Sequence, residues 1–154
     1  MKRLPPIEKI YEALTAVADG RVIVDGDPQR SEGYAKVTSS DGTRTYDLSW
    51  DVSTYSSNDN ATYWQGYPGY PVIALLMVRG KLPYDEALAK NLAGVNWTEL
   101  NSLHRNDYAA AVSQVIAERG LDPKVTSTEV QSIYSNLGRL PIAISRSPKK
   151  PPVK

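Results

Sequence analysis

The sequence predicts a single α+β domain, in which an N-terminal helix and a three-stranded antiparallel meander precede a helical half. Three features predict this class. Apolar residues recur at helical spacing over residues 6–18, two alternating runs flank Asp41-Gly42, and residues 71–79 are almost entirely apolar. Strands grouped before helices are typical of α+β folds, whereas strands and helices alternate in α/β folds.

The first predicted helix covers residues 6–18, because its apolar side chains recur at i, i+3, i+4 and i+7 and so form one stripe. Asp19-Gly20 ends it, since glycine readily takes the left-handed conformation that closes many helices. Residues 21–24 follow as the first predicted strand, Arg-Val-Ile-Val.

A hairpin is predicted over residues 34–39 and 43–52, because Asp-Gly between two alternating runs is a strong hairpin signal. In its second arm, apolar and polar side chains alternate, so one face of the sheet should pack on the core and the other should face water. The side chains expected on the packed face are Tyr46, Leu48, Trp50 and Val52.

Residues 71–79 are the predicted centre of the core, as a short buried helix. Seven consecutive apolar residues run from Val72 to Val78, and Pro71 and Gly80 suit the start and the end of a helix. A helix that is apolar on every side must be covered on every side. It is too short to span a membrane, which needs about 20 apolar residues.

Three further helices are predicted from apolar periodicity and glycine stops, at 84–93, 97–118 and 127–137. The middle one is expected to break near residues 105–107, where Asn106 and Asp107 can begin a second segment. Thr126 and Glu129 have the spacing of a capping box at the start of the last helix.

The end of the chain changes in composition. Residues 140–145 are compatible with a late edge strand, since Pro141 restricts a strand to an edge or a start. Residues 146–154 contain four basic residues, three prolines and no acid. A segment of this kind cannot bury apolar surface, so we expect residues 1–145 to form the globular domain and 146–154 to form a disordered basic tail.

Composition limits the classes of function. The chain of 154 residues has no cysteine and one histidine, which excludes thiolate chemistry and sites with two imidazoles. The start lacks the apolar stretch of a signal peptide, so a cytoplasmic location is expected, with no membrane partner. Residues 1–138 carry 13 basic against 17 acidic residues, a balance that does not favour nucleic acid.

No catalytic or cofactor motif is present. The sequence has no phosphate-binding loop, dinucleotide fingerprint or nucleophile elbow. Asp47, Asp51 and Asp59 do not have the spacing of a metal site. His104 lies near the apolar stripe of its helix, which is typical of a packing residue. We therefore expect no cofactor and no metal, and an enzyme is not favoured.

The most unusual stretch is residues 55–70, where five of sixteen residues are aromatic. Connections this long are usually functional or carry their own packing. The functional interpretation is a non-enzymatic binding module that contacts a protein or a small ligand through aromatic anchors and amide groups. The candidate binding residues are Asn58, Asn60, Tyr63, Trp64, Gln65, Tyr67 and Tyr70.

Two alternatives stay open. In the first, the aromatic segment only covers the central helix. We expect a mixture, with Trp64 buried and Tyr63 or Tyr67 partly exposed beside Asn58 and Asn60. In the second, residues 85–105 form a helix-turn-helix-like DNA-binding segment, although its basic and acidic residues balance.

Overall fold

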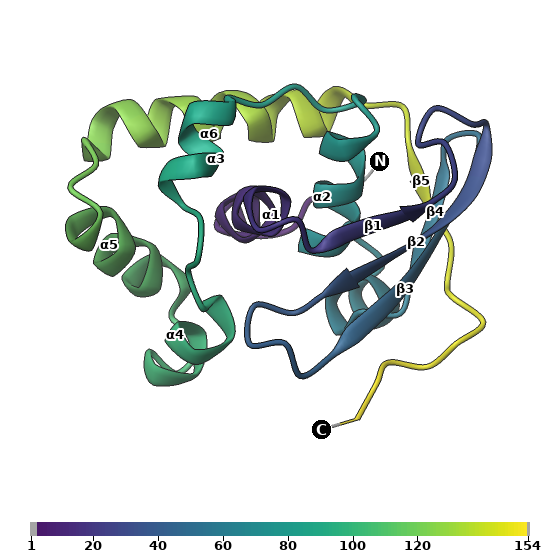
Figure 1. Cartoon of the computed structure of the whole chain (residues 1–154), viewed down its shortest axis with the longest axis horizontal. Coiled ribbons are helices and arrows are strands. Elements are labelled where there is room, and N and C mark those ends of the chain that lie inside the picture. The colour runs from purple at the N-terminus through teal and green to yellow at the C-terminus, as the bar shows by residue number, and fades with distance from the viewer. Residues whose placement is uncertain (1–2, 154) are drawn as a thin grey trace.

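Residues 3–153 are described by a computed structural model, which places five strands in one mixed sheet and packs helices against one of its faces (Figure 1). The strands are β1 (Val22–Asp25), β2 (Glu32–Thr38), β3 (Thr45–Asp51), β4 (Thr54–Ser57) and β5 (Ala143–Ile144). The helices are α1 (Lys9–Ala18), the π-helix η1 (Ala61–Gln65), α2 (Tyr70–Val78), α3 (Glu86–Asn91), α4 (Trp97–Leu103), α5 (Tyr108–Glu118) and α6 (Pro123–Arg139).

The strands lie in the order β1-β2-β3-β4-β5. The first four are antiparallel neighbours, and β5 joins β4 in parallel through the Thr54–Ala143 pairing. The predicted α+β class, the meander β1–β3 and the late edge strand are confirmed. The sequence did not indicate β4, because Tyr55 is the only large apolar residue within Thr54–Ser57.

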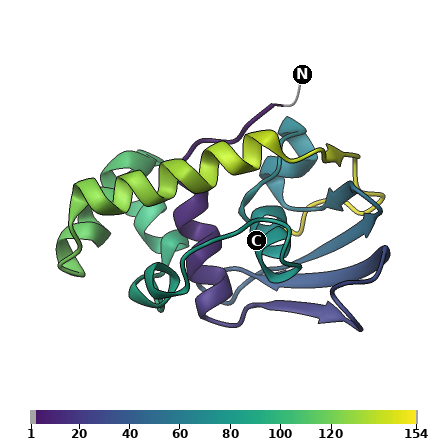
Figure 2. The ribbon, with the colours of Figure 1, turned by 90° about the horizontal axis from the view of Figure 1, so that it is seen from above.

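The predicted central helix is confirmed as α2. It packs against α1 on one side and against β1, β3 and β4 on the other, so it lies between α1 and the inner face of the sheet. Leu75 and Leu76 are both fully buried. Figure 2 shows α6 crossing over α1 on the helical side, where the two helices are in contact.

Helix boundaries follow the capping residues. The predicted break after α4 is confirmed: Arg105 and Asn106 have φ values of 54° and 64°, and the Asp107 carboxylate accepts from the Ala110 N–H at 3.1 Å. The capping box predicted at Thr126 is wrong. Asp122 caps α6 instead, accepting from the Lys124 N–H at 2.9 Å, and Pro123 occupies the first helical position.

Val52 is the residue of the hairpin that departs from the predicted pattern. Its side chain is 70% exposed, whereas Tyr46, Leu48 and Trp50 are buried on the inner face as expected. The strand alternation ends at Asp51, where β3 stops and the chain turns toward β4. Val52 takes φ 56° in that turn, so it no longer continues the β3 pleat.

Residues 146–153, for which the sequence predicted disorder, have a defined path beside the sheet (Figure 1). The Ser147 side chain is buried, and the Lys149 ammonium lies 3.5 Å from the Asp47 carboxylate. The Lys150 carbonyl accepts from the Asn58 amide at 3.2 Å. We call residues 146–153 the C-terminal strap.

Candidate functional site

The aromatic segment 55–70 contains two elements that its sequence did not indicate. It begins within β4 and then forms the π-helix η1, which ends at Gly66 with φ 75°. π-Helices are rare, and many of them lie at functional sites. The segment then enters α2, so its backbone is held by the sheet at one end and by the core at the other.

Asp59 holds the backbone around η1. Its buried carboxylate accepts from the Ser57 hydroxyl and from the Thr62 N–H, the latter at 3.0 Å. Burial raises the pKa of this carboxyl, and these two donors oppose the rise. Gly69 passes so close to Asp59 Oδ2 that an added Cβ would clash with it. The backbone at Gly69 therefore packs directly against the Asp59 carboxylate.

Of the two rings that η1 presents, that of Trp64 is exposed and that of Tyr63 is half-buried. Trp64 is 60% exposed, and its ring lies edge-on to that of Tyr63, with a centroid separation of 4.7 Å. The Arg146 guanidinium lies 4.9 Å from the centroid of the Tyr63 ring and 5.7 Å from that of the Trp64 ring. A depression of about 160 Å³ lies among η1, Ile144 and Arg146.

Arg3 extends this surface. Its guanidinium lies 5.4 Å from the centroid of the Tyr67 ring and donates to the backbone carbonyl of Gln65. Gln65 also lines the depression, so Arg3 and Arg146 both border η1. We define the aromatic–arginine patch as Arg3, Tyr63, Trp64, Tyr67 and Arg146.

Two hydrogen bonds place the arginines at the patch from distant parts of the chain. The Ser145 N–H donates to the Tyr55 carbonyl at 2.9 Å, which sets the position of the next residue, Arg146. The Tyr134 hydroxyl donates to the Pro5 carbonyl at 2.6 Å and fixes the segment that carries Arg3. No signal in the sequence connected either arginine with the aromatic segment.

The structure brings only some of the predicted site residues together. Tyr63, Trp64, Gln65 and Tyr67 lie on or beside η1, but the expected burial of Trp64 is wrong. Asn58 is buried away from the rings, and its side-chain oxygen accepts from the Asp47 N–H at 2.7 Å. Tyr70 packs against Tyr46. Asn60 is exposed at the start of η1 without capping it.

Burial also affects Tyr70, the last residue of the aromatic segment. The Tyr70 hydroxyl lies near the core at the start of α2, and burial strongly raises its pKa. A phenol held neutral in this way supports packing, not proton transfer at neutral pH. We therefore assign Tyr70 to the core and the other three aromatic residues to the patch.

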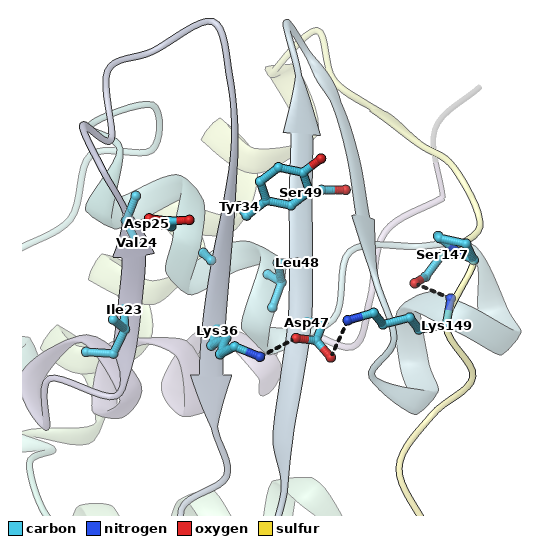
Figure 3. A pocket seen from close by; sticks show the side chains of 12 residues that line it. Ile23, Val24, Asp25, Tyr34, Lys36, Asp47, Leu48, Ser49, Ser147 and Lys149 are labelled. Carbon is cyan, nitrogen blue, oxygen red and sulfur yellow. Dashed lines mark hydrogen bonds and ion pairs between the residues drawn. The ribbon is translucent and has the colours of Figure 1, made fainter.

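A second hollow, of about 550 Å³, lies on the outer face of the sheet between β1 and the C-terminal strap (Figure 3). Ile23 and Tyr34 are exposed along it. The Asp47 carboxylate lies 2.7 Å from the Lys36 ammonium, and its hydrogen bond with Lys36 is the main cause of its lowered pKa. The Lys149 ammonium contacts the other oxygen of Asp47 at 3.5 Å. The single Asp47 carboxylate is therefore already paired with both ammonium groups.

The helix-turn-helix-like segment corresponds to α3 and α4. The Thr98 N–H in the first turn of α4 donates to the Ser40 hydroxyl at 2.9 Å, and Trp97 is buried. The β2–β3 turn therefore covers the end of α4 that a recognition helix would present to DNA bases.

Other kinds of site find no support in residues 3–153. His104 shares a hydrogen bond of 2.6 Å with Gln114, as suits a boundary residue. Within this range, no group of three or more histidine and acidic side chains is placed to hold a metal ion. The described helices include none with the length and apolar character that crossing a membrane requires.

The chain belongs to the family described as Uncharacterised conserved protein UCP014422, whose model matches residues 2–143. This match includes η1 and the three patch aromatics, and it ends before Arg146. No curated protein and no solved structure matches the chain.

Proposed function

We propose that the protein is a non-enzymatic binding module that holds a partner protein through the aromatic–arginine patch. The observation that carries this proposal is the 60% exposure of Trp64 on a helix whose backbone is fixed from below by Asp59. Tryptophan, tyrosine and arginine are the residues most enriched among binding hot spots. The exposed Trp64 indole contributes little to the stability of the fold. We infer that it contacts another molecule.

The rigidity of the patch supports the same function. Binding energy is lost when side chains and loops must be ordered on association. The ring contact of Tyr63 with Trp64 and the position of the Arg146 guanidinium over both rings order these side chains before any partner arrives. The alternative, that residues 55–70 only cover α2, accounts for Tyr55 and Tyr70 but leaves Trp64 without a structural role.

The geometry supports DNA binding through residues 85–105 less well. The first turn of α4 is covered by Ser40, and most non-specific affinity for DNA requires basic contacts to phosphates. The outer-face hollow is also less favoured as the main site, because the charges of Lys36, Asp47 and Lys149 are satisfied within the protein.

The test compares proteins retained from an extract of the source cells by the immobilised parent and by two variants. The Trp64→Ala variant should lose a partner that the parent retains. The Ile23→Ala variant, which removes an equally exposed apolar side chain from the outer face of the sheet, should keep it. If Trp64→Ala and the parent retain the same proteins, the patch is not the binding surface.

A further inference from the structure

The charge of the patch is unbalanced. Arg3 and Arg146 border η1, and within residues 3–153 neither guanidinium forms an ion pair with a carboxylate. Asp59 is the only acid in residues 55–70, and it is buried beneath η1. The surface of the patch therefore presents two positive charges and no negative one, whereas residues 1–138 carry more acidic than basic residues.

The arginines are also placed to donate outward. Arg146 makes ring contacts but no hydrogen bond with any described residue, so its N–H groups are free to meet an acceptor. A guanidinium that stacks on a ring through its flat face keeps its edge for hydrogen bonds, and its fork matches the two oxygens of a carboxylate. Arg3 uses one N–H group for the Gln65 carbonyl, and its other donors remain.

The depression beside these charges is small. Its volume of about 160 Å³ suits one side chain, and its walls are mixed: Tyr63, Trp64 and Ile144 contribute apolar atoms, and Thr62, Gln65 and Arg146 contribute polar ones. A bound segment thus needs one anchor for the depression and acceptors that reach the arginines on either side.

We propose that the partner presents an acidic segment, in which one leucine-like or aromatic side chain enters the depression and flanking carboxylates pair with Arg146 and Arg3. This inference rests on the proposed function and adds the chemistry of the partner. It follows from charge complementarity, which fixes the register of a partner and excludes partners of like charge.

The arrangement of the rings favours a peptide over single-stranded nucleic acid. Base stacking requires open ring faces that follow the strand, together with a groove of positive charge along the backbone. The Tyr63 and Trp64 rings meet at 78° instead of lying parallel, and Arg146 lies over both rings. The two arginines border a single helical turn and do not form an extended groove.

The experiment selects binders from a phage-displayed library of random peptides and measures the affinity of the enriched peptides as synthetic fluorescent probes. Enriched peptides should carry glutamate or aspartate next to one large apolar residue. Replacing their acids with glutamine should weaken binding by about tenfold or more, which is the usual scale for charge-assisted hydrogen bonds. A labelled oligothymidine serves as the nucleic-acid probe.

Charge-matched variants locate the effect. Arg3→Gln combined with Arg146→Gln should weaken binding of the acidic peptides by about tenfold or more and flatten its dependence on salt. Lys90→Gln combined with Lys124→Gln removes the same charge from exposed positions on α3 and α6 and should leave the affinity unchanged. Circular dichroism of both double variants confirms that they are folded.

Each other outcome overturns the inference. If the enriched peptides are neutral or basic but depend on Trp64, the partner is not acidic and the proposed function stands. If oligothymidine binds the patch more tightly than the acidic peptides, the partner is a nucleic acid. If no peptide binds in a Trp64-dependent manner, the proposed function fails together with the inference.

Discussion

At the scale of single residues, Arg79 shows how a charge is held inside this fold without a carboxylate. The side chain is 3% exposed, and its N–H groups donate to the carbonyls of Pro28 at 2.8 Å and Arg30 at 2.9 Å and to the Tyr55 hydroxyl. The guanidinium also lies 4.4 Å from the centroid of the Trp50 ring. One side chain therefore joins the end of α2, the β1–β2 loop and the inner face of the sheet.

Arg79→Met should lower the free energy of unfolding by about 2–4 kcal/mol, because the Pro28 carbonyl and the Tyr55 hydroxyl would lose a donor, and the Arg30 carbonyl would keep only the Trp50 indole N–H. Chemical denaturation followed by far-UV circular dichroism measures this. Lys81→Met, at an exposed position just beyond the same helix, is the control and should change stability by less than about 0.5 kcal/mol. Equal effects of the two substitutions would contradict the role given to Arg79.

Val52 is a second residue whose conformation has an energetic cost. A β-branched side chain at φ 56° is strained, and the left-handed region costs about 1–2 kcal/mol for residues with a Cβ. Val52→Gly should raise stability by about 0.5–1 kcal/mol after the added entropy of the unfolded chain is counted. Thermal unfolding measures the change.

Ser53 provides the control for this substitution, since it lies in the same turn and its φ is not positive. Ser53→Gly should be neutral or destabilising, because it gains flexibility in the unfolded state without relieving strain. If both glycine substitutions lower stability equally, Val52 is not strained.

At the scale of elements, the π-helix η1 depends on a contact between two parts of the aromatic segment. Gly69→Ala places a Cβ against Asp59 Oδ2 and also 3.1 Å from Thr62 Oγ1. Because the packed backbone of α2 follows directly, the strain should loosen η1 and lower stability by about 1–3 kcal/mol. The same substitution should weaken partner binding, since the rings of η1 lose their fixed position.

Gly138→Ala is a matched control. Its Cβ would meet only Leu4 Cδ1 at 3.4 Å, an ordinary contact, and alanine favours the helical backbone of α6. Stability should therefore stay unchanged or rise by up to about 1 kcal/mol. Hydrogen exchange of the amides in residues 59–69 distinguishes local loosening of η1 from global destabilisation. Unchanged exchange there in Gly69→Ala would show that the contact does not hold η1.

The elements that the sequence predicted share a local cause. The helix that became α1 has a complete apolar stripe, the β2–β3 hairpin has Asp41-Gly42, and α2 has an uninterrupted apolar run. The elements that it missed depend on distant partners. Ser56 in β4 is held by β3 and by a Ser145 hydroxyl at 2.6 Å. Thr62 in η1 is held by Asp59, which accepts from its N–H, and by Gly69, whose N–H donates to its hydroxyl at 2.9 Å.

At the scale of the whole molecule, the same reasoning explains how much of the site could be predicted. The aromatic composition of residues 55–70 identified Tyr63, Trp64 and Tyr67, because local sequence determines which rings are present. It could not identify Arg3 and Arg146, which reach the patch only after α6 and β5 have packed. It also could not divide the rings between core and surface, since that division follows from the turn of η1.

The C-terminal strap gives a test of long-range packing that keeps all five patch residues in the chain. A chain that ends at Arg146 loses the buried Ser147, the acceptor of the Asn58 amide and the Lys149–Asp47 ion pair. The lost buried contacts should lower the free energy of unfolding by about 1–3 kcal/mol, measured by denaturant titration.

Lys149→Gln alone should have an effect below about 1 kcal/mol, because its ion pair is largely exposed. The truncation should therefore cost more than the point variant, because the buried polar contacts of the strap stabilise its packing and its exposed charges add little. A truncation that leaves stability unchanged would mean that residues 147–153 do not pack against Asn58 in solution. In that case the strap behaves as the disordered tail that its composition predicts.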